Sequence, residues 1–181
     1  CPRKIPGRNI VLVLGIDPGT RHLGYGLIKE EAGILSATDY GSLNFSPSLP
    51  IEQRLHQIHS HILNMINMFN PSEIAVEEPF LGTGNNQFVG PAFAIGQAQA
   101  AVLIAAASNN LPIFRYAPTK IKSVIANHGQ ATKEQIKSMI ILSLSLTVEP
   151  DSTDASDALA AALCHIRHRD LETILNRQIE P

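Results

Sequence analysis

The segment Ile10-Val-Leu-Val-Leu-Gly-Ile-Asp17, followed by Pro18 and Gly19, decides how the chain folds. A run of apolar residues that ends in a Pro-Gly turn is typical of a central strand, buried on both faces of a sheet. Asp17 closes this strand, and a buried carboxylate is costly unless it is paired, hydrogen-bonded or bound to a metal. Asp17 is therefore either a turn residue before Pro18 or part of a functional site, and the segment alone leaves both interpretations open.

The segments that follow alternate between strand and helix patterns. Apolar positions spaced three and four apart predict helices, and β-branched runs bounded by Gly, Pro or Asn predict strands. The predicted strands are 10–17, 22–29, 34–45, 73–78 and 112–116, and the predicted helices are 51–69, 91–109, 118–127, 132–146 and 154–169. The pattern of the last helix can be followed to 179, and 80–90 is expected to be a loop. The order predicts an α/β fold with a mixed five-stranded sheet flanked by helices on both faces.

The composition is that of one globular domain, because 44% of the 181 residues are apolar and 17% are charged. We expect an N-terminal tail at 1–9, a domain at 10–170 and a C-terminal extension at 171–181. The 14 Lys and Arg against 16 Asp and Glu give a net charge of −2, so a nucleic acid would have to be bound by a local basic patch.

Two further observations bear on location. Cys1 and Cys164 are too few for a disulfide scaffold or a cysteine zinc site, and they suit a reducing compartment, so we expect a cytoplasmic protein. Residues 81–114 carry no charged residue and no His, but Gly, Pro, Asn and Gln interrupt them, whereas a membrane span needs about 20 apolar residues. We therefore expect no membrane association.

Further carboxylates stand in unusual places. Glu77 and Glu78 close a predicted strand, where sites of α/β proteins collect, although a solvated pair is an equal alternative. Asp154 and Asp157 share one face of the first turn of the last helix, where helix capping is the plainer interpretation. Capping needs only one Asp, and Asp151 could supply it.

Taken together, Asp17, Glu77, Asp154 and Asp157 form a set that can converge on one point of the fold. Four carboxylates in one cleft repel one another unless cations join them. Oxygen ligands without cysteine or a histidine pair favour Mg²⁺, for which Mn²⁺ substitutes. Two such ions are the machinery of in-line phosphodiester hydrolysis.

A basic segment accompanies these acids. Five cations lie within 23 residues, namely Arg115, Lys120, Lys122, Lys133 and Lys137. They form either an ordinary solvated face or a track for phosphates, and a neighbouring metal site favours the track. Phe80, beside a Gly-rich loop, either stacks on an unpaired base or packs into the core.

The ordered set of motifs resembles bacterial RuvC Holliday-junction resolvases. The segments are Leu14-Gly-Ile-Asp-Pro-Gly-Thr-Arg21, Gly24-Tyr-Gly-Leu-Ile28, Ala75-Val-Glu-Glu-Pro-Phe80, Gly96-Gln-Ala-Gln99, Phe114-Arg-Tyr-Ala-Pro118 and Asp154-Ala-Ser-Asp-Ala-Leu-Ala160. The Asp-Pro-Gly-Thr motif is only moderately specific, but the ordered set, which covers residues 10–168, is highly specific.

The resemblance implies an RNase H-like fold and a homodimer that nicks four-way DNA junctions symmetrically in recombination and repair. It implies Mg²⁺-dependent cleavage that leaves 5′-phosphate and 3′-hydroxyl ends, and the RuvA–RuvB branch-migration proteins as partners. Carried over by motif, the metal ligands would be Asp17, Glu77, Asp154 and Asp157. Phe80 would meet junction bases, and Lys122 and Lys133 would lie near the scissile phosphate. The charge-free helix at 91–109 is the candidate dimer seam.

This sequence departs from the family pattern in two places. The loop 81–94 is longer than usual and lacks a basic residue, and Gln99 stands where the family often has Arg. Three other functions compete with junction cleavage. They are nucleotide binding as in the actin and sugar-kinase group, cleavage of RNA hybrids or flaps by another RNase H-like nuclease, and junction binding without activity.

Overall fold

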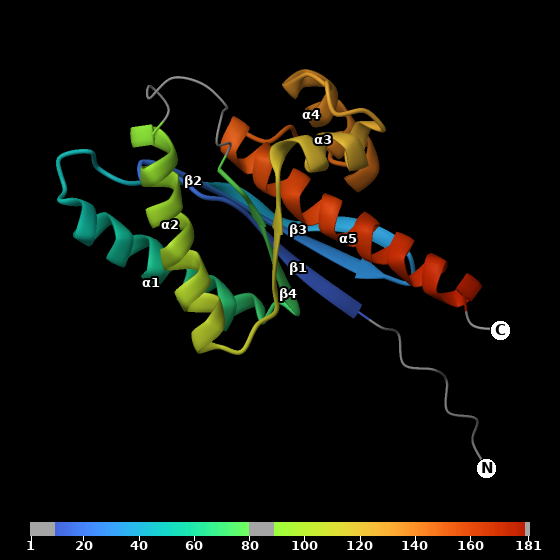
Figure 1. Ribbon diagram of the computed structural model, residues 1–181, viewed down its shortest axis with the longest axis horizontal. Helices are drawn as coiled ribbons and strands as arrows, with labels where there is room; N and C mark the ends of the chain where they lie inside the picture. Colours follow the sequence, from blue (N-terminus) through green and yellow to red (C-terminus); the bar gives the residue numbers. More distant parts are fainter. Residues whose placement is uncertain (1–9, 80–88, 180–181) are drawn as a thin grey trace, which may run out of the picture.

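A five-stranded sheet in the order β3-β2-β1-β4-β5 forms the centre of the molecule (Figure 1). The computed structural model describes residues 10–79 and 89–179. The strands are β1 (Ile10–Asp17), β2 (His22–Glu31), β3 (Ile34–Asn44), β4 (Glu73–Glu77) and β5 (Ile113–Tyr116). The first three pair antiparallel, whereas β4 and β5 continue the sheet from β1 in parallel. The predicted α/β fold with a mixed five-stranded sheet is confirmed.

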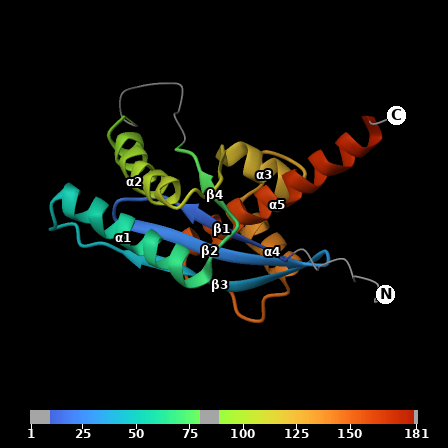
Figure 2. The ribbon, with the colours of Figure 1, turned by 90° about the horizontal axis from the view of Figure 1, so that it is seen from below.

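Helices cover both faces of this sheet (Figure 2). On one face lie α1 (Ile51–Phe69) and α2 (Val89–Ser108), and on the other lies α5 (Thr153–Ile179). Two shorter helices, α3 (Pro118–Ala126) and α4 (Lys133–Leu144), pack on α5. Among the described residues, no helix combines the length and apolarity needed to cross a membrane.

The start of α2 differs from the sequence prediction, and the end of α5 lies where the helical pattern of the sequence ends. α2 begins at Val89, inside the segment expected to be a loop, because a proline such as Pro91 is tolerated in the first turn of a helix. α5 continues as one helix to Ile179, as far as the sequence pattern could be followed, so residues 171–179 prolong it. Neither Gly nor Pro interrupts the chain between Thr153 and Ile179, and nothing in the local sequence ends the helix earlier.

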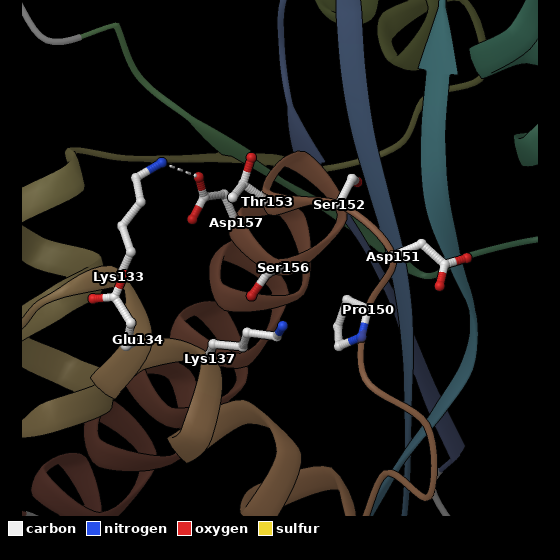
Figure 3. A pocket seen from close by; sticks show the side chains of 9 residues that line it. All are labelled: Lys133, Glu134, Lys137, Pro150, Asp151, Ser152, Thr153, Ser156 and Asp157. Atoms are coloured by element: carbon white, nitrogen blue, oxygen red, sulfur yellow. Dashed lines mark hydrogen bonds and ion pairs between the residues drawn. The ribbon is translucent and has the colours of Figure 1, made fainter.

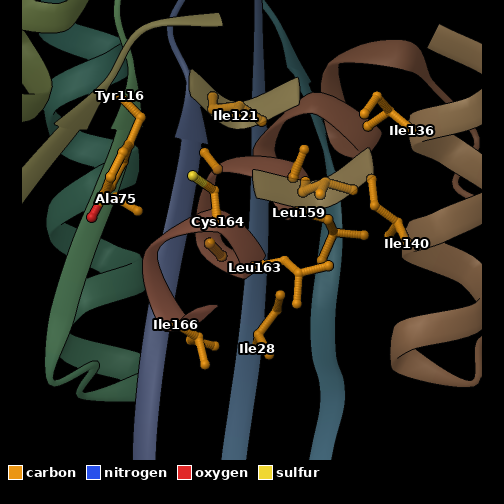
Figure 4. Packing of buried hydrophobic residues seen from close by; sticks show 14 of the residues in the cluster. Ile28, Ala75, Tyr116, Ile121, Ile136, Ile140, Leu159, Leu163, Cys164 and Ile166 are labelled. Carbon is orange, nitrogen blue, oxygen red and sulfur yellow. The ribbon is translucent and has the colours of Figure 1, made fainter. Parts of the chain in front are cut away.

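Two apolar layers hold the sheet between the helices. Val13 and Ala75 belong to the core that packs under α5, together with Leu159 and Leu163 of that helix (Figure 4). The alternate positions on β1 and β4 point to the other face, where they join buried residues of α1 and α2. Each strand therefore has one face toward α5 and one face toward α1 and α2, as a central strand should.

Close backbone contact fixes where α5 begins. A Cβ atom at Gly24 of β2 would lie 1.9 Å from the carbonyl oxygen of Asp154, and one at Gly15 of β1 would lie 2.0 Å from that of Ala158. Any other residue at these positions would push the helix away from the sheet. The two glycines therefore allow the first turns of α5 to rest directly on β1 and β2.

Candidate active site

The ends of β1 and β4 bring two acidic side chains together. Ile16 pairs with Val76 in the parallel register, so the next residues, Asp17 and Glu77, are neighbours at the carboxyl ends of adjacent strands. Side chains alternate along a strand, and Ala75 faces α5, so Glu77 two residues later faces α5 as well. The same alternation from Val13 directs Asp17 to that face.

The first turn of α5 adds the other two carboxylates. Gly24, on which the backbone of Asp154 rests, pairs with Asp17 across β1 and β2. The start of the helix therefore lies beside the end of β1. The helix cap is Ser152, whose Oγ accepts a hydrogen bond from the backbone N–H of Ala155 at 3.1 Å. Neither Asp154 nor Asp157 is needed for capping, and the plainer interpretation of that pair fails.

Burial and neighbouring carboxylates raise the pKa values of the two strand-end acids. Burial raises the pKa of Asp17 to about 7, and the nearby charges of Asp157 and Asp154 add to the rise. Burial raises the pKa of Glu77 to about 8, with further contributions from Asp17 and Asp157. Crowded, partly buried carboxylates favour the protonated form because their negative charges repel, so this group is poised to receive a cation.

The structure separates Glu77 from Glu78, which the sequence pattern alone could not do. Glu78 forms an ion pair with Arg115 of β5, with 3.8 Å between Oε1 and Nε. Glu77 instead shares the electrostatic environment of Asp17 and Asp157. Of the two glutamates, Glu77 is the one that joins the acidic cluster, which we define as Asp17, Glu77, Asp154 and Asp157.

Lysines border this cluster. Nζ of Lys133, on α4, donates a 2.9 Å hydrogen bond to Oδ2 of Asp157 (Figure 3). Lys122, on α3, lowers the pKa of Glu77, although less than burial raises it. Within residues 10–79 and 89–179, no group of three or more acidic, His or Cys side chains is arranged to hold a metal ion as it stands. In this conformation Asp157 is bonded to Lys133.

The other predicted DNA contacts are more dispersed. Lys120 is exposed on α3, Arg115 pairs with Glu78, and Lys137 pairs with Glu149, with 2.6 Å between Nζ and Oε2. Phe80 lies outside the described residues. The two lysines that the resemblance places near the scissile phosphate are the two that interact with the acidic cluster.

Two buried polar residues were missed or undervalued by the sequence interpretation. His165 is only 2% exposed; its Nδ1 lies 2.7 Å from Oη of Tyr116 and its Nε2 lies 2.9 Å from Oε2 of Glu73. Its position in an otherwise apolar helix turn was the available signal. Gln99 is buried, and within the described residues its Nε2 has no hydrogen-bond partner.

The chain is similar to known proteins in both sequence and fold. A family model described as "Crossover junction endodeoxyribonuclease RuvC" matches residues 13–165. A protein of that description from Dehalococcoides mccartyi is 42% identical over 91% of this chain and 98% of its own length. The structure of Thermus thermophilus RuvC in complex with a Holliday junction substrate has a TM-score of 0.82 at 34% identity, covering 90% of this chain and 97% of that chain. The yeast mitochondrial Holliday junction resolvase Ydc2 shares the fold at 14% identity, with a TM-score of 0.63 over 86% of this chain and 77% of its own.

Proposed function

The chain belongs to the RuvC family of crossover junction endodeoxyribonucleases, and from this premise we propose that it resolves four-way DNA junctions by metal-dependent hydrolysis at the acidic cluster. The observation that carries the proposal is the meeting of carboxylates from three distant segments. Asp17 and Glu77 end neighbouring parallel strands, and Asp154 and Asp157 begin the helix that rests on them. Crowding of partly buried acids with raised pKa values is typical of catalytic sites.

The donor set fits Mg²⁺, with Mn²⁺ as its substitute. All four side chains offer hard carboxylate oxygens, and burial together with the neighbouring carboxylates raises the pKa values of Asp17 and Glu77. The four residues of the acidic cluster would hold the ions. When bound, such ions generate a hydroxide nucleophile from water and stabilise the leaving 3′ oxygen of a phosphodiester. The expected products carry 5′-phosphate and 3′-hydroxyl ends.

The lysines that border the acidic cluster would contact the phosphates of the DNA. Lys133 neutralises Asp157 in the structure described here, and it is 65% exposed, so it can turn to a phosphate that enters the site. Lys122 adds positive charge on the side of Glu77. Arg115, Lys120 and Lys137 extend the basic surface beyond them, and each contributes mainly to salt-dependent phosphate binding.

A homodimer would place two such sites on one junction. The charge-free α2 presents an apolar outer side, on which Phe93 is 68% and Ile104 is 59% exposed. Large apolar side chains exposed on one helix are typical of an interface, and a two-fold pair matches two symmetric nicks. Light scattering of wild type and Ile104→Glu should give a dimer and a monomer respectively. The family membership also makes RuvA–RuvB the expected partners and the cytoplasm the expected location.

The decisive test is the cleavage of labelled substrates by Asp17→Asn. We expect Mg²⁺-dependent paired nicks in four-way junctions by wild type and a loss of at least about 10³-fold in rate for the variant, with junction binding retained. Asp170→Asn, an exposed aspartate farther along α5, is the matched control and should cut normally. Flap and RNA–DNA hybrid substrates belong in the same assay. Preferential cleavage of either would replace junction resolution with another nuclease activity, and junction binding without any nicking would indicate a scaffold.

A further inference from the structure

The turn that follows Asp17 joins β1 to β2 at the end of the sheet where the acidic cluster lies. It consists of residues 18–21, and Asp17 pairs with Gly24 on the far side of it. The turn is tight, because a Cβ atom at Gly19 would lie 2.2 Å from the carbonyl oxygen of His22. A displacement of the turn is therefore passed on to Asp17, the residue from which the turn begins.

Two neighbouring carbonyl groups of this turn are held from other parts of the chain. The carbonyl oxygen of Arg21 accepts a 2.8 Å hydrogen bond from the backbone N–H of Phe45, just after β3. The carbonyl oxygen of Thr20 accepts a hydrogen bond from Nη1 of Arg54, at 3.1 Å. Arg54 belongs to the first turn of α1, which lies on the face of the sheet opposite to α5 (Figure 2). Its side chain therefore reaches the turn from the face that does not carry the acidic cluster.

Arg54 adds little to stability by the contacts that it makes. The side chain is half-buried, and its Nε atom is buried without a hydrogen-bond partner among the described residues. A buried donor without a partner costs free energy, and this cost offsets the hydrogen bond that Nη1 makes. Thr20 is itself half-buried, so water can replace Arg54 at its carbonyl group. A cation kept in this arrangement beside Asp17 indicates a role in function.

We propose that Arg54 is a positioning residue for junction cleavage, which holds the turn at Thr20 and thereby keeps the Asp17 carboxylate in place beside Glu77. The inference rests on the proposed function and adds to it a residue from outside the acidic cluster. Arg54 does not touch the reacting atoms, since it lies on the other face of the sheet. It acts on the rate because a catalytic group displaced by about 1 Å can lower a rate about 10²-fold.

The test compares Arg54→Met and Arg54→Lys with wild type in cleavage at saturating junction and Mg²⁺. Methionine is an unbranched side chain without a donor, so Arg54→Met should cut about tenfold to 10²-fold more slowly while binding the junction in EDTA within about twofold of wild type. Its unfolding temperature should stay equal or rise, because the unpartnered Nε is removed. Arg54→Lys can still donate to the Thr20 carbonyl, so it should cut at a rate within about threefold of wild type.

Arg167 supplies the matched control. It is also half-buried, and its Nη1 also donates to a backbone carbonyl at 3.1 Å, that of Ile125, but its Nη2 donates in addition to Oγ of Ser143, at 2.7 Å. These contacts lie in the last turns of α3 and α4, so Arg167→Met should lower the unfolding temperature by about 5 °C and leave cleavage within about twofold of wild type. Arg54→Met should thus lose rate without stability, and Arg167→Met stability without rate.

An NMR measurement on the metal-free protein without DNA does not depend on cleavage. The carbonyl carbon resonance of Thr20 and the carboxyl carbon resonance of Asp17 should both shift in Arg54→Met and keep their wild-type positions in Arg167→Met. Wild-type cleavage by Arg54→Met, an equal loss of rate in Arg167→Met, or an Asp17 resonance that does not move would overturn the inference while leaving junction cleavage intact. A wild-type protein that cuts no junction would instead defeat the proposed function, and with it the role of Arg54 in cleavage.

Discussion

Each end of β4 carries a glutamate, but the two glutamates have different surroundings. Glu73 and Glu77 lie on one strand, four residues apart, and therefore face the same side of the sheet, toward α5. At the first end, Oε2 of Glu73 lies 2.9 Å from Nε2 of His165 and 3.5 Å from a guanidinium nitrogen of Arg169. At the second end, Glu77 lies beside Asp17 and Asp157, and burial with their charges raises its pKa to about 8.

The difference separates acids that stabilise the fold from acids that serve a reaction. Glu73 has polar partners in His165 and Arg169, and Tyr116 continues the chain of hydrogen bonds through His165. Around Glu77 the negative charges are in excess, and the fold tolerates a repulsion that it does not need for packing. An unfavourable arrangement that persists at a strand end indicates a function that uses it.

The largest expected effect comes from exchanging each glutamate for glutamine. Glu77→Gln removes a carboxylate of the acidic cluster, so we expect junction cleavage to fall by at least about 10³-fold, while stability without metal stays equal or rises as repulsion is relieved. Glu73→Gln breaks the pairs with His165 and Arg169, so we expect cleavage within about twofold of wild type but a loss of about 1–3 kcal/mol in the free energy of unfolding. Cleavage rates and urea unfolding of both variants measure the two effects. A cleavage defect in Glu73→Gln as large as that in Glu77→Gln would abolish the distinction.

The next effect concerns the contact that brings α5 to the functional end of the sheet. In Gly24→Ala the new methyl group would lie 1.9 Å from the carbonyl oxygen of Asp154, so the first turn of α5 must move. We expect a loss of about 3 kcal/mol in stability and a large loss of cleavage, since Asp154 and Asp157 move with the helix. Gly96→Ala on α2 is the control, because a Cβ there meets nothing within 4 Å. Thermal unfolding and cleavage measure both, and wild-type cleavage by Gly24→Ala would show that the position of this turn is unimportant.

Most of the fold and the members of the acidic cluster could be predicted from the sequence, because the patterns that indicate them lie within short segments. Each acidic residue of the cluster could be recognised from its own segment. Asp17 ends an apolar run, Glu77 ends a predicted strand, and Asp154 and Asp157 begin a predicted helix. The segments alone did not show that these four acids lie close together, and the resemblance to the family motifs provided that expectation. The continuation of α5 to Ile179 follows the helical pattern of the sequence, whereas the start of α2 at Val89 lies two residues before the predicted one.

The features that the sequence could not predict are contacts between residues far apart in the chain. The bond between Lys133 and Asp157 joins α4 to α5, and the pairing of Glu73 with His165 spans 92 positions of the chain. No spacing rule connects such residues, because their separation in sequence says nothing about the path of the chain between them. Ser152 was overlooked as the cap of α5 because three aspartates nearby offered equally good capping chemistry.

The smallest effect is a pH dependence of stability with opposite signs at the two ends of β4. The pKa values of Asp17 and Glu77 are raised in the folded protein to about 7 and about 8, so the folded state holds protons that the unfolded state has released. In EDTA, the acidic cluster should therefore make the folded state progressively less stable as the pH rises from about 5 to about 8. At the other end, burial lowers the pKa of His165, so the unfolded state takes up a proton first and stability is lost as the pH falls below about 6.5.

Urea unfolding of wild type and of Asp17→Asn/Glu77→Gln across this range separates the two contributions. The double variant should keep only the rise of stability with pH that His165 contributes, and the difference from wild type should grow toward pH 8. Saturating Mg²⁺ should reduce the difference by stabilising the wild-type protein at high pH, because a bound cation favours the ionised carboxylates. Parallel curves for the two proteins in EDTA would mean that the acids at the end of β4 do not repel one another, and the contrast between the two ends of the strand would lose its physical basis.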